Sequence, residues 1–140
     1  MPNEGTGNWI CPNCGRNFAR KNQSHSCELF SIKEHHLKKA TPLTIQLYNK
    51  FVSIFQDFDP ILIEPLKNII AIKKNSQFLT IQIQKMALKI IFRSHTLFSS
   101  PRLILMPVQE KLNYYRFKIQ KMDEIDEELT DWMHQAYMEN

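Results

Sequence analysis

The three cysteines of this 140-residue chain all lie between positions 11 and 27, and a histidine lies beside the last of them. Cys11 and Cys14 flank a Pro-Asn pair, and His25 and Cys27 follow after ten intervening residues. Three sulfurs and one imidazole nitrogen suit a tetrahedral, borderline-soft ion such as Zn²⁺. The segment is therefore predicted to be a zinc knuckle, in which Gly15 adopts the positive φ that lets backbone amides face the sulfurs.

Other interpretations of the cysteines fit the sequence less well. An odd number of cysteines argues against a disulfide framework, and a thioredoxin-like redox pair needs a strand before it and a helix at it. The His-x-Cys spacing is shorter than usual, so Glu28, His35 or His36 could replace His25 as the fourth ligand. A closed set of four ligands leaves no position for substrate, so the metal is expected to build structure.

The chain divides by composition into a small module, a linker and one domain. Residues 1–28 form the expected zinc-finger module, and residues 29–40 form a linker without sustained periodicity. The module is too short to bury a core by itself, so Trp9 and Phe18 are expected to pack around the metal. Metal binding then supplies the folding free energy of the module.

Two helices are predicted at the ends of the domain of residues 41–140. Thr41 followed by Pro42 is typical of a helix start, and the closing helix is expected to be capped by Asp123. Apolar residues recur at helical spacing in both segments, which indicates one buried face on each helix. The two stripes are Leu47, Phe51, Ile54, Phe55 and Phe58, and Ile125, Leu129, Trp132, Met133 and Ala136.

Between the helices the sequence favours strands. Residues 78–84, 86–93 and 114–119 alternate between apolar and polar side chains, and residues 68–73 are rich in isoleucine. Residues 61–64 and 103–106 adjoin prolines, which favours short strands at the edges. The expected fold is α+β: a helix, an antiparallel sheet of four to five strands, and a C-terminal helix packed on one face of the sheet.

Charge is segregated along the chain. The formal net charge is +4 and the isoelectric point is about 9.0. Residues 67–121 hold eleven Lys or Arg against one acid, whereas residues 122–140 hold seven acids and no Lys or Arg. Basic side chains on one sheet face and on the zinc module could contact phosphates. The candidate contact residues are Arg16, Arg20, Lys21, Lys73, Lys89, Arg93, Tyr114, Arg116 and Lys118.

These features favour a non-enzymatic, zinc-containing binding protein that contacts nucleic acid or another anionic partner, mainly through backbone phosphates. A protein adaptor that docks through the zinc finger or the acidic C-terminal helix is the alternative, and the lysines could also serve only to solvate the sheet. An enzyme is less favoured, because the sequence holds no Gly-rich phosphate loop, nucleophile elbow or His-Glu-x-x-His pair. His134 is the remaining candidate acid or base.

The expected location is the cytoplasm, without a membrane partner. No apolar run approaches the roughly 18 to 20 residues that span a bilayer. Residues 1–8 are polar and lack the pattern of a secretion signal.

Two segments of the sequence resemble a known family. The N-terminal segment reads W-x-C-P-x-C-G-R-x-F over residues 9–18 and N-Q-x-H-S-C over residues 22–27. Near the other end, residues 115–117 resemble a strand and residues 126–137 a closing helix of the same family. The chain resembles the bacterial family catalogued as domain of unknown function 5655, in the version that carries this zinc motif. The resemblance implies a zinc finger joined to a small α+β domain of the binding type, a kind sometimes found beside nuclease-like modules.

Overall fold

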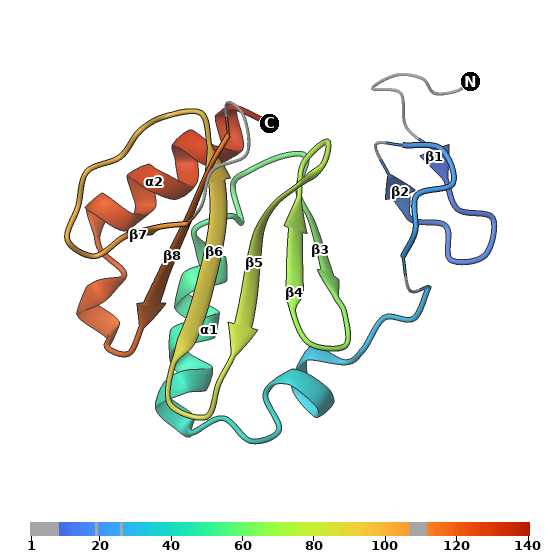
Figure 1. Ribbon diagram of the computed structural model, residues 1–140. Coiled ribbons are helices and arrows are strands. Elements are labelled where there is room, and N and C mark those ends of the chain that lie inside the picture. The colour runs from blue at the N-terminus through green and yellow to red at the C-terminus, as the bar shows by residue number, and fades with distance from the viewer. Residues whose placement is uncertain (1–8, 19, 26, 107–111) are drawn as a thin grey trace.

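A six-stranded antiparallel sheet forms the centre of the computed structural model, which describes residues 9–18, 20–25, 27–106 and 112–140. The strands lie in the order β3-β4-β5-β6-β8-β7 (Figure 1). Their bounds are β3 Leu62–Pro65, β4 Ile70–Lys73, β5 Gln77–Ile83, β6 Leu88–Ser94, β7 Ile104–Leu105 and β8 Asn113–Ile119. The expected α+β class is confirmed, but four to five strands was too low. Both short edge segments pair with a neighbour, β3 with β4 and β7 with β8.

The alternating pattern of the long strands separates two faces of the sheet. In β6 the side chains of Leu88, Ile90 and Phe92 are buried, and the intervening side chains are half-buried. The register aligns Ile90 with Phe117 of β8, so apolar residues of neighbouring strands share one face. We call this the covered face, and the other the open face.

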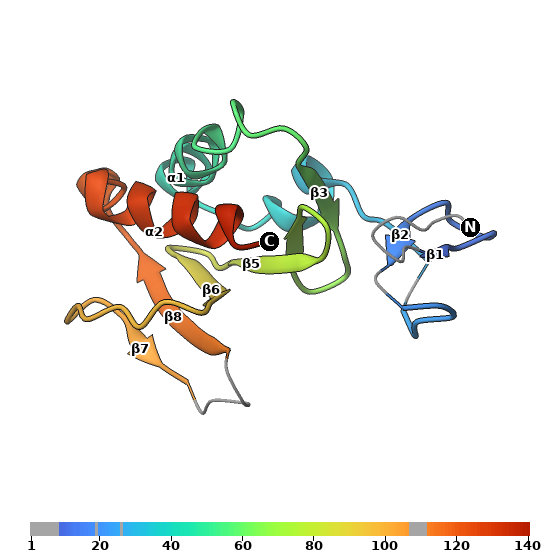
Figure 2. The same ribbon diagram turned by 90° about the horizontal axis from the view of Figure 1, so that it is seen from above.

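Both helices pack on the covered face. Helix α1 (Pro42–Ser53) begins at Thr41, whose hydroxyl oxygen accepts a hydrogen bond from the amide of Thr44 at 3.2 Å. Helix α2 (Glu127–Met138) lies on the same side of the sheet (Figures 1 and 2). The Trp132 indole of α2 packs against Phe117 of β8 with ring centroids 5.6 Å apart, which ties the helix to that strand.

The start of the closing helix differs from the expectation. Asp123 lies in a short 3-10 turn (Met122–Glu124), and Asp126 caps α2 by accepting a hydrogen bond from the amide of Leu129 at 3.0 Å. Between the turn and α2, Ile125 has a non-helical backbone (φ −88°, ψ 78°) and a side chain buried in the core, so the helix begins after it.

The N-terminal segment forms a separate small unit beside β3. Strands β1 (Trp9–Ile10) and β2 (Asn17–Phe18) pair as an antiparallel hairpin (Figure 1). The following segment includes a short π-helical turn (Ile32–His36) and approaches β3, where the amide of Phe30 donates to the carbonyl of Pro65 at 2.8 Å. Residues 1–8 of the expected module lie outside the described residues.

In the described part of the chain, the helices are too short or too polar to cross a bilayer. The cytoplasmic location remains a prediction.

Replacing Asp126 tests the capping assignment. The Leu129 amide holds the pKa of Asp126 below its usual value of about 3.9, and Arg102 contributes in the same direction. We expect Asp126→Ala to lower the free energy of unfolding by about 1 kcal/mol at neutral pH. Because the folded-state pKa is lowered, this contribution is present above the unfolded-state pKa and is lost as the pH falls through the folded value.

Urea unfolding at neutral and acid pH measures both effects. Asp123→Ala is the matched control, since that carboxylate is exposed in the preceding turn, and its effect should stay within about 0.5 kcal/mol. Equal losses in the two variants, or a difference independent of pH, would contradict the assignment.

Candidate metal centre and basic sheet face

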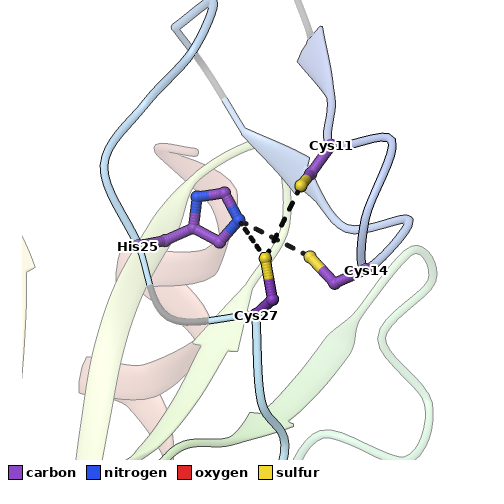
Figure 3. A group of neighbouring side chains, drawn as sticks. All are labelled: Cys11, Cys14, His25 and Cys27. Carbon is purple, nitrogen blue, oxygen red and sulfur yellow. Dashed lines mark hydrogen bonds between the residues drawn. The ribbon is translucent and has the colours of Figure 1, made fainter.

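Four side chains of the N-terminal unit converge on one point (Figure 3). The Sγ atoms of Cys11 and Cys27 are 3.8 Å apart, and His25 Nε2 lies 3.5 Å from the Sγ atoms of both Cys14 and Cys27. All four ligand atoms lie within 4.8 Å of one another. The sequence therefore identified a set of residues that can hold a metal ion.

The backbone between the first two cysteines is shaped for this arrangement. Gly15 has φ +73°, as expected, and its amide donates to the carbonyl of Cys11 at 2.8 Å. The amide of Cys11 in turn donates to the carbonyl of Arg16 at 3.0 Å, which closes the hairpin. The Cys14 amide donates to the Cys11 sulfur and lowers the pKa of that thiol to about 6, so the thiolate form of this ligand is favoured.

His25 is held in an orientation that suits a ligand. Its Nδ1–H donates to the carbonyl of Gln23 at 2.6 Å, so in the neutral ring the proton-free nitrogen is Nε2, which faces the sulfurs. The same carbonyl raises the pKa of His25. The ring packs on Phe18 with centroids 4.1 Å apart and against Trp9 at 6.0 Å, so the expected packing of both aromatic residues is confirmed.

The alternative fourth ligands lie elsewhere. The cluster of the described residues consists of the three cysteines and His25. His35 instead contacts the carbonyl of Lys67 through Nε2 at 2.7 Å and packs on the ring of Phe30. Glu28 and His36 are likewise outside the cluster.

The N-terminal unit that carries the Cys/His cluster, called the metal unit below, is joined to the sheet by a buried group of charges. Arg16 Nη2 donates to Glu64 Oε1 at 2.8 Å, and Lys73 Nζ lies 3.3 Å from the same oxygen. All three side chains are less than 10% exposed. Lys73 also donates to the carbonyl of Asn17 and lies 4.6 Å from the ring centroid of Phe18.

The expectation that Arg16 and Lys73 are solvent-facing basic residues is therefore wrong. Both are among the buried residues, because the metal unit covers the end of the open face at β3 and β4. Sequence analysis also missed Glu64, their shared partner. The sequence does show one carboxylate within the otherwise apolar segment of residues 61–65, which indicates an unusual position. Nothing local identifies the distant cations that this carboxylate contacts.

The remaining candidate contact residues divide into three groups. Arg20 and Lys21 are exposed on the metal unit, beside the cluster in sequence. Arg93 donates to Ser76 Oγ and, at 2.7 Å, to Asn140 Oδ1, so its guanidinium is already engaged. Four residues of β6 and β8 share the open face toward the β7 edge of the sheet: Lys89, Arg116, Lys118 and Tyr114.

The open face is hollowed beside these strand residues. A cavity of about 480 Å³ lies between β6, β8 and the segment that leads into β7. Its lining includes Lys89, Arg116 and Lys118, together with Arg102, which sequence analysis did not single out. A smaller hollow of about 110 Å³ includes Tyr114 and Arg93 on the neighbouring part of the sheet.

The acidic helix does not neutralise this surface. Helix α2 lies on the covered face, on the other side of the sheet from Lys89, Arg116 and Lys118. Its carboxylates of Asp126 and Glu128 pair instead with Arg102, at 3.0 and 3.1 Å. His134, the candidate acid or base, is exposed on α2 and contacts the ring of Phe58.

The fold and the site together define an α+β domain with an N-terminal Cys/His cluster that can hold a metal ion. The chain belongs to the family described as Domain of unknown function (DUF5655), whose model matches residues 33–140. The match includes both helices and the whole six-stranded sheet and begins after the cluster. No curated protein and no solved structure matches the chain.

Removing the shared carboxylate tests how the metal unit is joined to the sheet. Glu64→Gln would remove the buried carboxylate that Arg16 and Lys73 share, so we expect the free energy of unfolding to fall by about 3 kcal/mol. Glu34→Gln is the control, because that carboxylate is exposed, and its effect should stay within about 0.5 kcal/mol. Denaturant unfolding measures both. Similar values for the two variants would show that the buried charges do not join the units.

Proposed function

We propose that Cys11, Cys14, His25 and Cys27 bind one Zn²⁺ ion. Two Zn–S bonds of about 2.3 Å at the tetrahedral angle separate their sulfurs by about 3.8 Å, and a sulfur and a nitrogen ligand by about 3.5 Å. The distances between the ligand atoms, 3.8 and 3.5 Å, fit this geometry. The hydrogen bond from His25 Nδ1 to a backbone carbonyl is the outer contact that zinc-bound histidines commonly make.

The role of this zinc is structural. Four protein ligands close a tetrahedral site and leave no position for water or substrate. Around the ion, the hairpin offers only a small apolar cluster of Trp9, Phe18 and the His25 ring. The ion therefore supplies much of the free energy that orders the hairpin and presents Arg16 to Glu64.

Histidine variants distinguish the proposed fourth ligand from its alternatives. We expect His25→Ala to weaken zinc binding at least tenfold in a competition titration with a colorimetric chelator. His35→Ala is the matched control and should bind zinc as the parent protein does, because His35 contacts the Lys67 carbonyl. A loss confined to His35→Ala would transfer the ligand role to that residue, and one zinc per chain is expected by elemental analysis.

We further propose that the protein binds nucleic acid through the phosphate backbone, without catalysing a reaction. The observation that carries this proposal is the set of three cations on the open face. In the part of the chain that the structure describes, no carboxylate lies within 4 Å of Lys89, Arg116 or Lys118. A polyanion would supply the missing counter-charge, with Arg20 and Lys21 of the metal unit as further contacts.

A protein adaptor is the second candidate, and it is supported by a different surface. Ile10 of the metal unit is 60% exposed, and the exposed side of α2 carries Glu127, Glu128 and Asp131. An apolar contact would survive high salt, whereas phosphate contacts would weaken.

A salt series tests the nucleic-acid proposal. We expect labelled single-stranded DNA or RNA to bind the zinc-loaded protein, with log affinity falling linearly with log salt concentration. For a single strand, contacts from the three open-face cations alone predict a slope of about −2, and contacts that include Arg20 and Lys21 predict about −3.5. Fluorescence anisotropy at several salt concentrations gives the slope, and a chelated sample shows what the metal unit adds. No binding at low salt would reject the proposal and favour a protein partner.

A further inference from the structure

The larger hollow of the open face is lined by cationic side chains and by an apolar one. Its floor carries Lys89 of β6 with Arg116 and Lys118 of β8. One side is formed by Ile104 of β7, which is 52% exposed and lies opposite Arg116 in the strand register. The volume, about 480 Å³, lies within the range of roughly 300 to 1,000 Å³ that holds small organic ligands.

The cations of the floor are placed against one another. Lys89 and Lys118 are directly opposite in neighbouring strands, and such pairs have Cβ atoms about 4.5 to 5.5 Å apart. Arg116 is two residues from Lys118 and therefore on the same face. Like charges in this position destabilise a sheet, and an anion seated among them would offset the repulsion.

The wall formed by Arg102 is fixed and already neutralised. Its guanidinium is held by the carboxylates of Asp126 and Glu128 and by the carbonyl of Glu124. It also lies 5.1 Å from the ring centroid of Trp132. Arg102 thus gives the hollow a rigid side, whereas the free positive charge is confined to the floor.

We propose that this hollow seats one nucleotide of a single strand, with its phosphate on Lys89, Lys118 and Arg116 and its sugar and base toward Ile104. The inference rests on the proposed nucleic-acid binding and makes it specific. A cationic floor beside an apolar side matches a ligand that is charged at one end and less polar at the other. A paired duplex cannot insert a nucleotide into a hollow without opening, so single strands bind in preference to duplexes.

The test compares two double variants of equal charge change. Lys89→Gln/Lys118→Gln removes the opposed pair, and Lys33→Gln/Lys67→Gln removes two exposed lysines beside β3, at the far edge of the sheet. The probe is a fluorescently labelled single-stranded oligothymidylate. We expect at least about tenfold weaker binding for the first variant and less than about twofold for the second. Adenosine monophosphate should compete with the strand more effectively than inorganic phosphate.

Stability measurements guard against a folding artefact. Removing both members of a like-charge pair should leave the unfolding temperature of the Lys89→Gln/Lys118→Gln variant unchanged or slightly raised. Weaker binding together with an intact fold would support the seat.

Each opposing result has its own meaning. Equal losses in the two variants, or equal binding of duplex and single strand, would overturn the nucleotide seat and leave general phosphate binding in place. If inorganic phosphate competes as strongly as the mononucleotide, the hollow binds only an anion and does not recognise the sugar and base. That result would overturn the inference. If the parent protein binds no strand at all, the proposed function fails, and the seat fails with it as a site for a strand. Calorimetry with adenosine monophosphate then shows whether a free nucleotide is the source of the phosphate.

Discussion

The buried carboxylate of Glu64 determines where the metal unit lies on the sheet. A carboxylate that is 8% exposed needs partners, and it finds them in Arg16 and Lys73, one from each unit. Arg16 follows the Cys-Pro-Asn-Cys turn directly after Gly15, and its carbonyl accepts a hydrogen bond from Cys11. The turn that holds two of the clustered cysteines therefore also holds the arginine that docks, so the Cys/His cluster and the docking contact depend on the same short segment.

This docking divides the open face of the sheet. One cross-strand row runs from Glu64 through Ala71, Thr80 and Ile91 to Arg116, and every member lies on the same face because antiparallel neighbours in register do. The metal unit contacts the end of that row at β3 and β4, and the larger hollow lies at the other end beside β7. The two candidate sites thus share one surface, while both helices occupy the other.

Local features of the sequence predicted local features of the structure. The four metal-site residues, the positive φ of Gly15 and the Thr41 cap each depend on neighbours within a short stretch of chain, and all were identified. The alternation in the long strands also predicted the correct faces, since a period of two fixes which side chains point together.

Contacts between distant parts of the chain could not be predicted in this way. Lys73 was predicted to be exposed because its burial depends on a contact with the metal unit. That contact includes the pair of Arg16 and Glu64, which are 48 residues apart in sequence. Both short edge segments were predicted as strands, but the total of four to five was too low, because the pairing of such segments is decided by their partners and not by their own pattern.

The segregation of charge along the sequence becomes a segregation across the sheet. Most acids of the last segment lie on or just before α2, which packs on the covered face, and two of them, Asp126 and Glu128, pair with Arg102. Lys89, Arg116 and Lys118, which have no carboxylate partner among the described residues, lie on the open face. Under the proposed zinc binding, metal removal would act on this balance in two opposite ways. It would expose Arg16 and Lys73 together with their shared carboxylate, a net gain of positive charge, and it would disorder the segment that presents Arg20 and Lys21. Net charge alone therefore does not determine how a chelator would change the affinity for a polyanion. The change would depend on where the basic side chains lie around the hollow and on the metal unit.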